Sequence, residues 1–158
     1  MKIEDAIQSK FPSPQVKAIV NLRYTANFVG AIQNSFMSGF GLTMPQFNIL
    51  RILRGAGGDI TVNTVKDRMI EKSPNTTRLM DKLIDKGLIS RTRCGEDRRV
   101  VYVKISKAGL DLLTEIDVKF EDEEEKFVPY QLSDADAEKL SELLDKLRDC
   151  VITESDRK

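Results

Sequence analysis

The chain of 158 residues contains no histidine and only two cysteines, Cys94 and Cys150. The cysteines form no CxxC pair, and without histidine we expect no metal site and no bound cofactor. Catalysis needs a nucleophile within reach of a base, for which histidine is the usual choice, and the chain also lacks a glycine-rich phosphate loop. These absences argue against an enzyme, and the scarcity of cysteine fits a reducing cytoplasm.

Long apolar runs are absent as well. No stretch of about 18 apolar residues occurs, so we expect no membrane-spanning helix. The segment from Met1 to Asp5 lacks the apolar region of a secretory signal peptide. A hydrophobic content of 41 % is sufficient for a core, and a charged content of 32 % indicates a soluble protein. We therefore predict a cytoplasmic protein without membrane contact.

The net charge of zero hides an asymmetry along the chain. Residues 61–107 carry twelve Lys and Arg against six Asp and Glu, a local charge of +6, and residues 1–60 carry +3. Residues 108–158 carry seven against sixteen, a local charge of −9. DNA attracts a local basic face even when the total charge is zero, so the middle of the chain is the candidate for DNA contact. Acidic residues 121–125 are interpreted as a solvated helix face.

A heptad-like apolar seam predicts a long first helix from Val16 to about Phe40. Its spacing alternates between three and four residues, with a polar interruption at Gln33, and Gly39 and Gly41 end it. Two compatible interpretations remain open: the helix packs on the core of its own domain, or it also packs on a partner chain. The seam consists of Ile19, Leu22, Ala26, Val29, Gln33, Phe36 and Phe40.

Shorter elements follow these glycines. Thr43 is expected to cap a second helix, with Pro45 just inside its start, where the missing N–H costs nothing. Ile60 is expected in a short strand, and a third helix is expected from Thr61 to about Ile70.

A fourth helix is predicted within SPNTTRLMDKLIDKG, with Ser73 as its cap, Pro74 in its first position and Gly87 after its end. Helical periodicity places two sets of side chains on opposite faces of this helix. The inward set is Leu79, Leu83 and Ile84, with Thr76 at its start, and the outward set is Asn75, Thr77, Arg78, Asp81, Lys82 and Asp85.

A basic β-hairpin comes directly after the fourth helix. Leu88 and Ile89 lead into its first strand, and apolar residues alternate with their neighbours in the second, from Val100 to Ile105. The tip consists of Gly95, Glu96, Asp97, Arg98 and Arg99.

Two further helices are expected, capped by Ser106 and Ser133 and separated by Pro129. The apolar residues of the fifth helix are Leu110, Leu113, Ile116, Phe120 and Phe127. Those of the last helix are Leu140, Leu143, Leu144, Leu147 and Val151.

The start of the fourth helix offers the side chains that a DNA-reading helix needs. Asparagine pairs with adenine, threonine donates to bases and contacts the thymine methyl group, and arginine or lysine reaches guanine or phosphate. The free N–H groups of a helix start also favour a phosphate. The alternative is an ordinary helix start with no ligand. The candidate DNA-binding residues on this helix are Ser73, Asn75, Thr76, Thr77, Arg78 and Lys82.

The hairpin tip adds a second candidate contact. Arg98 and Arg99 are adjacent, and arginine is favoured in a narrow minor groove, where the negative potential is deepest. Asp97 would repel phosphate, unless it forms a salt bridge that holds one of these arginines in position. The alternative is a polar turn with a surface ion pair worth about 0–1 kcal/mol. A helix followed at once by such a hairpin is typical of a winged helix-turn-helix, so we predict a mainly α fold with a small β wing that binds DNA.

The chain resembles the MarR family of transcription regulators from about Leu42 to Leu113. The match runs in order through LTMPQFNILRIL, SPNTTRLMDKLIDKGLISR and EDRRVVYVKISKAGLDLL. In the family these stretches form the second helix, the recognition helix, the wing and the start of a long C-terminal helix. Asp97 and Arg99 fall on the Asp-x-Arg motif of the wing, and residues 76–78 fall on the threonine-rich start of the recognition helix. The segment 106–109 stands where the family often has Thr-x-x-Gly.

The resemblance implies a two-fold dimer in which the N- and C-terminal helices of both chains interlock. One MarR-like domain would span residues 1–158, with dimerisation helices at about 1–40 and 108–158 and the winged part at about 42–107. Such a dimer reads a pseudo-palindromic operator in double-stranded DNA. The implied function is a homodimeric, sequence-specific transcriptional regulator, a repressor released by a small molecule. The alternative is a winged-helix module for protein interaction that does not read DNA sequence.

Many family members respond to small aromatic ligands held between the dimerising and DNA-binding parts. Tyr24, Phe28 and Phe47 are the candidate lining residues here, and packing in the core is the alternative for each. Redox-sensing members use a reactive cysteine near the N-terminus. This chain has no cysteine before Cys94, which argues against peroxide sensing.

Overall fold

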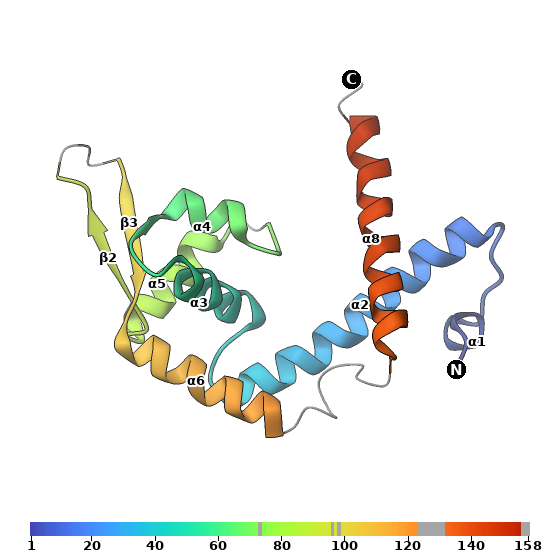
Figure 1. Cartoon of the computed structure of the whole chain (residues 1–158), viewed down its shortest axis with the longest axis horizontal. Coiled ribbons are helices and arrows are strands. Elements are labelled where there is room, and N and C mark those ends of the chain that lie inside the picture. Colours follow the sequence, from blue (N-terminus) through green and yellow to red (C-terminus); the bar gives the residue numbers. More distant parts are fainter. Residues whose placement is uncertain (73, 96, 98, 123–131, 156–158) are drawn as a thin grey trace. The chain divides into compact units, whose positions relative to one another are not determined.

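The computed structural model describes residues 1–72, 74–95, 97, 99–122 and 132–155, with side chains up to 150. The chain divides into two compact units, Met1–Lys119 and Phe120–Lys158. The class is mainly α-helical with a three-stranded antiparallel sheet, which confirms the predicted helical fold with a small wing (Figure 1). The elements are α1 (Ile3–Ile7), α2 (Pro14–Gly39), α3 (Met44–Ala56), β1 (Ile60–Thr61), α4 (Val62–Arg68), α5 (Thr76–Asp85), β2 (Ile89–Arg93), β3 (Val101–Ile105), α6 (Lys107–Asp122) and α8 (Asp134–Ser155).

The predicted long first helix is α2, and it begins two residues earlier than the apolar seam indicated. The Ser13 hydroxyl accepts a hydrogen bond from the Val16 N–H at 3.2 Å and caps the helix. The short helix α1 was not foreseen from the sequence. It is tied to α2 by an ion pair between Glu4 and Lys17, and the hydrogen bond from Lys17 holds the pKa of the Glu4 carboxyl below its ordinary value.

Helix α3 begins as the sequence predicted. The Thr43 hydroxyl accepts a hydrogen bond from the Gln46 N–H at 3.4 Å, and the Gln46 Oε1 accepts one from the Thr43 N–H at 3.0 Å. This reciprocal capping box satisfies two N–H groups that the helix itself leaves without partners. Gly57, with φ of +68°, follows the end of the helix and closes it in the left-handed conformation.

Helix α5 begins later than predicted. Its first helical residue is Thr76 and its N-cap is Asn75, so the placement of Pro74 in the first helical position was wrong. Ser73, the predicted cap, lies outside the described residues. The end was predicted correctly, because Gly87 follows the C-cap Lys86 with φ of +69°.

The inward face of α5 also differs from the prediction. Thr76 and Leu83 are buried as expected, and Met80, which was not foreseen, is buried with them. Leu79 and Ile84 are only half-buried. The buried face of α5 therefore centres on residues 76, 80 and 83. It is rotated about the helix axis relative to the predicted face of Leu79, Leu83 and Ile84.

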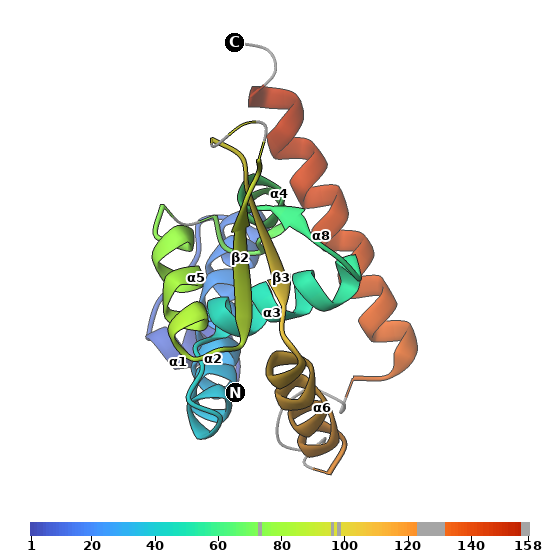
Figure 2. The same ribbon diagram turned by 90° about the vertical axis from the view of Figure 1, so that its left-hand side faces the viewer.

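The three strands form one sheet in the order β1-β3-β2, and both pairings are antiparallel. In the β2–β3 hairpin Ile89 pairs with Ile105 and Arg93 with Val101, which confirms the predicted wing. Figure 2 shows the hairpin beside α5, with β1 along the other edge of β3. The sheet therefore fixes the wing next to the helix that was predicted to read DNA.

The core lies between the helices of the winged part and the base of the hairpin. It contains a set of apolar side chains with at most 1 % exposure, from the end of α2, from α3, α4, α5 and β3, and from the first part of α6. Fully burying each such side chain stabilises the fold by roughly 1.5–3 kcal/mol relative to leaving it in water. These residues are Met37, Ile49, Leu50, Leu53, Val65, Leu83, Val103, Leu113 and Ile116.

The start of α6 packs tightly against the turn between α5 and β2. The Ser106 hydroxyl accepts a hydrogen bond from the Gly109 N–H at 3.1 Å and donates one to the Gly87 carbonyl at 2.7 Å. A Cβ atom on Gly109 would lie 2.3 Å from the Leu88 carbonyl oxygen and 2.8 Å from a side-chain carbon of Ile105. Glycine is therefore required at this position, and Ser106 caps α6 as predicted.

Charged side chains join α3 to α6. The Asp117 carboxylate accepts hydrogen bonds from the Arg51 guanidinium at 3.2 Å and the Arg54 guanidinium at 2.6 Å. The three side chains are between 30 % and 49 % exposed, so solvent screens the pairs and each contributes about 1 kcal/mol or less. The two pairs link helices that already share a core.

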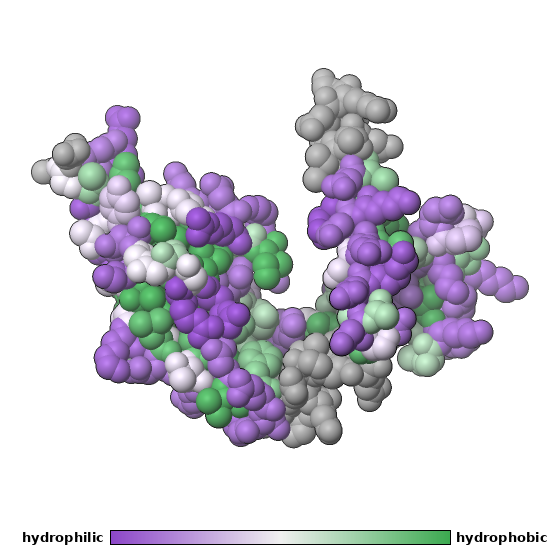
Figure 3. All heavy atoms as spheres, viewed as in Figure 1, coloured by the Kyte–Doolittle hydropathy of each residue, from purple (hydrophilic) through white to green (hydrophobic). Residues whose placement is uncertain are grey.

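The apolar side chains of α2 and α8 are mostly exposed. In α2, Val16 and Ile19 are each 42 % exposed, and in α8 Leu140 is 47 % and Leu143 54 % exposed. Ser133 caps α8 as predicted, through the Asp136 N–H at 3.2 Å, whereas the predicted positions of Phe127 and Pro129 lie outside the described residues. The visible face of α8 in Figure 3 is predominantly hydrophilic, as expected of a helix whose leucines follow one stripe.

Candidate nucleic-acid interface

The candidate reading surface begins on the outer face of α5. Because Met80 and Leu83 are buried on one side of the helix, the opposite side faces solvent. Asn75, Thr77 and Arg78 lie on this side and are exposed, and so is Lys82 one turn further along. The outer face therefore presents an amide, a hydroxyl and two cations, the donor and acceptor types that read base edges and phosphates.

Thr76 lies on the other side of the helix from these candidates. Its side chain is 1 % exposed and packs in the core with Met80. A side chain that is buried in the free protein cannot reach a base, so the assignment of Thr76 as a DNA contact does not fit the fold. Ser73 was a candidate as well, and it lies outside the described residues.

The tip of the wing is organised by Asp97. Its carboxylate oxygen Oδ1 accepts a hydrogen bond from the backbone N–H of Arg99 at 2.9 Å, and its carbonyl accepts one from the Val100 N–H at 3.0 Å. An aspartate in this arrangement holds a tight turn. The position of Arg98 lies outside the described residues, so the predicted ion pair between Asp97 and a neighbouring arginine stays a prediction.

A small cleft is lined by residues of both the wing and α5. It has a volume of about 250 Å³ and lies where β1 and the start of α4 meet α5 and the wing. Thr77 from α5 and Arg99 from the wing line it together, although 22 positions separate them in the sequence. The other lining residues are Thr61, Val62, Asn63, Arg91, Val100 and Val101.

Arg91 is the main residue of this surface that the sequence prediction missed. Its guanidinium donates a hydrogen bond to the Asp81 carboxylate at 2.8 Å, which ties the first strand of the wing to the outer face of α5. The two side chains are 45 % and 48 % exposed. The signal was present in the sequence, because Arg91 and Arg93 lie two positions apart and therefore on one face of a strand.

The candidate effector residues lie apart from the cleft between α5 and the wing, on α2 and α3. Tyr24 is 40 % and Phe28 is 61 % exposed on α2. Phe47 is half-buried in α3, and the Arg51 guanidinium lies 5.9 Å from the centre of its ring. The three aromatic residues thus stay predictions.

Across the described ranges, no group of three or more His, Cys, Asp or Glu side chains is placed to hold a metal ion. No helix within those ranges combines the length and apolar character needed to span a bilayer. Cys94 is half-buried and Cys150 is exposed.

Comparison with known proteins identifies the family. The MarR family model matches residues 42–101, which cover α3 through the wing. A transcription factor of this family from Planctomyces limnophilus is 33 % identical in sequence, and its crystal structure superposes with a TM-score of 0.66 over 88 % of this chain and 98 % of the other.

Two further proteins extend the comparison. The HTH-type transcriptional repressor MdtR of Bacillus subtilis is 35 % identical over 82 residues, 52 % of this chain and 48 % of its own, so this chain spans about half of that curated relative. The structure of BpsR from Bordetella bronchiseptica, whose DNA binding is regulated by 6-hydroxynicotinic acid, is 23 % identical with a TM-score of 0.72 over 84 % of this chain and 98 % of that one. The fold, the family model and the identity over nearly the whole length of the first protein agree, and the chain belongs to the MarR family of transcription regulators.

Proposed function

We propose that this protein is a homodimeric, sequence-specific regulator that binds double-stranded DNA and represses transcription until a small molecule releases it. The observation that carries the proposal is the single surface on which Thr77 of α5 and Arg99 of the wing line one cleft. A winged helix that binds DNA needs both elements on one side, because the helix enters the major groove while the wing reaches the adjacent minor groove.

The side chains on this surface differ in the part of the DNA that each would contact. Asn75 and Thr77 would contact base edges, since both are exposed at the start of α5, the end that enters the groove. Arg78 and Lys82 would contact guanine or phosphate, and Arg98 and Arg99 would lie in the flanking minor groove. Asp97 would not touch DNA, because its carboxylate already holds the Arg99 backbone.

Dimerisation is proposed from the exposed apolar side chains outside the winged part. Leu22 on α2 and Leu143 on α8 are 36 % and 54 % exposed, and Leu140 lies one turn before Leu143. Stripes of this kind favour burial against a second copy, which gives a two-fold assembly in the common case. On this proposal one MarR-like domain spans residues 1–158, with dimerisation helices at about 1–40 and 108–158 and a winged part at about 42–107.

A two-fold dimer predicts the form of the operator. Its two recognition helices would lie about 34–36 Å apart, one turn of duplex, and would read a pseudo-palindrome. The compartment that holds the DNA is the cytoplasm, which is where we expect the protein to act. No catalytic activity forms part of this proposal.

The name of the MdtR relative supports repression, and the BpsR structure supports control by a small aromatic acid. In this chain the exposed rings of Tyr24 and Phe28 on α2 are the proposed effector contacts. Phe47 would contribute from α3 beside Arg51, a cation that suits an acidic ligand.

The proposal is tested by selecting bound duplexes from a random pool at low salt. The expected result is one enriched motif with two-fold symmetry and half-sites about 10 base pairs apart. The affinity should fall steeply with salt, since phosphate contacts release counterions. Retention on a protein partner together with no enrichment of any duplex would overturn the proposal and would favour the protein-interaction module instead.

A further inference from the structure

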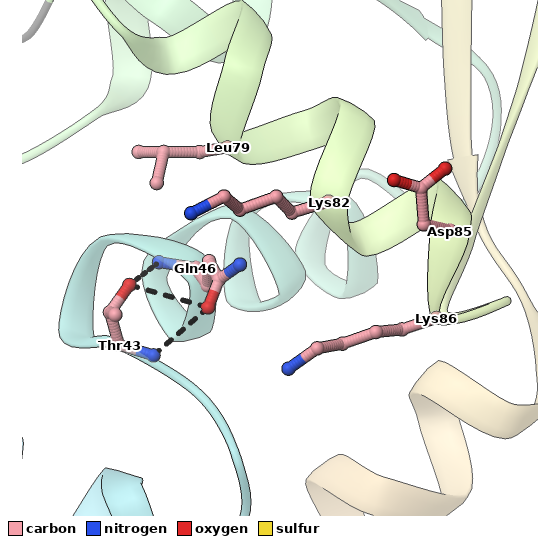
Figure 4. A pocket seen from close by; sticks show the side chains of 6 residues that line it. All are labelled: Thr43, Gln46, Leu79, Lys82, Asp85 and Lys86. Atoms are coloured by element: carbon pink, nitrogen blue, oxygen red, sulfur yellow. Dashed lines mark hydrogen bonds between the residues drawn. The ribbon is translucent and has the colours of Figure 1, made fainter.

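A second pocket lies on the winged part, away from the cleft between α5 and the wing. It has a volume of about 390 Å³ and lies between the start of α3 and the second half of α5. Figure 4 shows that the side-chain nitrogens of Lys82, Gln46 and Lys86 face the same open region, while the Asp85 carboxylate points away from them. The lining residues are Thr43, Gln46, Leu79, Lys82, Asp85 and Lys86.

Gln46 is the informative member of this pocket. Its side chain is only 4 % exposed, and its Oε1 is committed to the Thr43 N–H in the capping box. That backbone donor fixes the orientation of the amide, so Nε2 must be the atom that faces the pocket. Within the described residues no group accepts a hydrogen bond from Nε2. Among the described residues Glu4 Oε2 is the only buried side-chain nitrogen or oxygen without a partner, so Gln46 Nε2 reaches the open pocket and is available to donate to a bound acceptor.

The two lysines supply charge around this amide. Lys82 has no hydrogen-bond or ion-pair partner among the residues that the structure describes. Lys86 donates to the Gly41 carbonyl, which uses one of the three N–H bonds of its ammonium group. The N-terminal end of the 13-residue helix α3 adds a partial positive charge to the same region. The pocket thus offers several donors and no opposing carboxylate at its centre, the arrangement that an anion requires.

We propose that this pocket binds one backbone phosphate of the operator in each half-site. The inference rests on the proposed function and adds Gln46 and Lys86 to the residues that contact DNA. Along α5 the rise of about 1.5 Å per residue puts Lys82 about 9 Å and Lys86 about 15 Å beyond Thr76. The major groove is about 12 Å wide, so lysines at that distance from the inserted end reach the phosphates on its edge. Such a contact carries no base information and fixes the register of the reading helix.

The substitution Gln46→Glu tests the site with little change to the fold. Glutamate can keep the capping box, because one oxygen can still accept from the Thr43 N–H. The second oxygen would replace the donor with a negative charge. We expect the affinity for the selected duplex to fall at least tenfold, with an unchanged preferred sequence and an unchanged melting temperature. Lys86→Gln should weaken binding several-fold and lower the salt slope by about 1.

Lys139→Gln is the matched control, because it removes one positive charge from a lysine of α8 that pairs with Glu142. It should bind within twofold of the wild type. If Gln46→Glu and Lys86→Gln also bind within twofold of the wild type, the pocket takes no phosphate and the inference is overturned.

A second experiment distinguishes a backbone phosphate of the operator from a free phosphate ion. Duplexes that carry a single uncharged methylphosphonate should show one position per half-site where neutralisation weakens the wild type but not Gln46→Glu. If no such position exists while inorganic phosphate protects the wild type and not Gln46→Glu from thermal unfolding, the pocket takes a free anion and the operator contact is wrong. If the wild type binds no duplex at all, the proposed function itself is wrong. If the wild type and both variants bind the duplex equally well, only the phosphate site is wrong.

Discussion

The winged part and the helices outside it use their apolar residues in opposite ways. Between Met37 and Ile116 most of the large apolar side chains form a closed core, with Leu53, Leu83 and Leu113 fully buried. Several apolar side chains in the first half of α2 and along α8 are exposed by a third to a half or more, Leu143 among them. The winged part is thus folded within one chain. In contrast, α2 and α8 carry apolar stripes that can be buried only against a further surface, such as that of a second copy. The difference is the basis for proposing that DNA recognition and dimerisation belong to separate segments.

The largest effect is expected from breaking the stripe of α8. Leu143→Glu places a charge in the proposed dimer interface of both copies. Each buried leucine contributes roughly 1.5–3 kcal/mol, so the dimer dissociation constant should rise about 100-fold or more. Sedimentation velocity at micromolar concentration would show a single chain, with the helical circular dichroism of the winged part retained. Ser141→Glu is the control, because it adds the same charge to the same helix away from the leucine stripe, and it should stay dimeric. If both variants dissociate equally, the leucine stripe is not part of the dimer interface.

The next largest effect concerns the winged part alone. Gly109→Ala forces a Cβ atom to within 2.3 Å of the Leu88 carbonyl oxygen, so the backbone must shift. Overpacking of this kind costs about 1–3 kcal/mol of unfolding free energy, measurable by urea denaturation. Gly55→Ala is the control, because a Cβ there meets nothing within 4 Å and should stabilise α3 by about 0.5–1 kcal/mol. Equal stability of the two variants would show that the α6 start is not tightly packed.

An intermediate effect is expected at the wing. Arg99→Ala should weaken binding to the selected duplex by about tenfold and lower the slope of log affinity against log salt by about 1. The reason is that the variant loses one charge from the minor groove while the turn held by Asp97 remains. Arg99→Lys keeps the charge and should keep the slope. A titration of Arg99→Ala with the slope of the wild type would exclude this residue from phosphate or groove contact.

The smallest change in total affinity is expected at the reading helix. Asn75→Ala should alter the preferred base at one position of each half-site by about 1–3 kcal/mol, while the affinity for mixed sequences changes little. Duplex selection with the variant would measure this preference. Thr76→Ser is a useful companion, since Thr76 is buried and its substitution should leave the selected motif unchanged. An Asn75→Ala variant that selects the same site as the wild type would remove Asn75 from the reading set.

Local rules predicted most of the fold. Caps at Thr43 and Ser106, the glycine after α5 and the alternating second wing strand follow from interactions within a few residues, and the structure confirms them. The start of α5 was misjudged because Ser-Pro is only a statistical signal for a helix start. Met80 was missed because a helical period of 3.6 leaves the centre of a short apolar stripe uncertain by one residue.

The candidate site was less accessible to such rules. The outward positions of Asn75, Thr77 and Arg78 follow from helical periodicity, and the structure presents them as exposed. The pairing of Arg91 with Asp81 and the pocket around Gln46 depend on contacts between elements that are distant in the sequence. Sequence patterns give the face on which a residue lies, but the neighbour across that face is set by tertiary packing.

The central claim is that two copies, joined through segments outside the winged part, hold two basic winged parts on one duplex. The most direct test is the mass of the complex formed with the selected operator, measured by sedimentation equilibrium alongside a duplex that contains one half-site. We predict two chains per operator duplex and binding to the half-site duplex that is weaker by at least 100-fold. A single chain bound to the half-site as tightly as to the whole operator would contradict the claim.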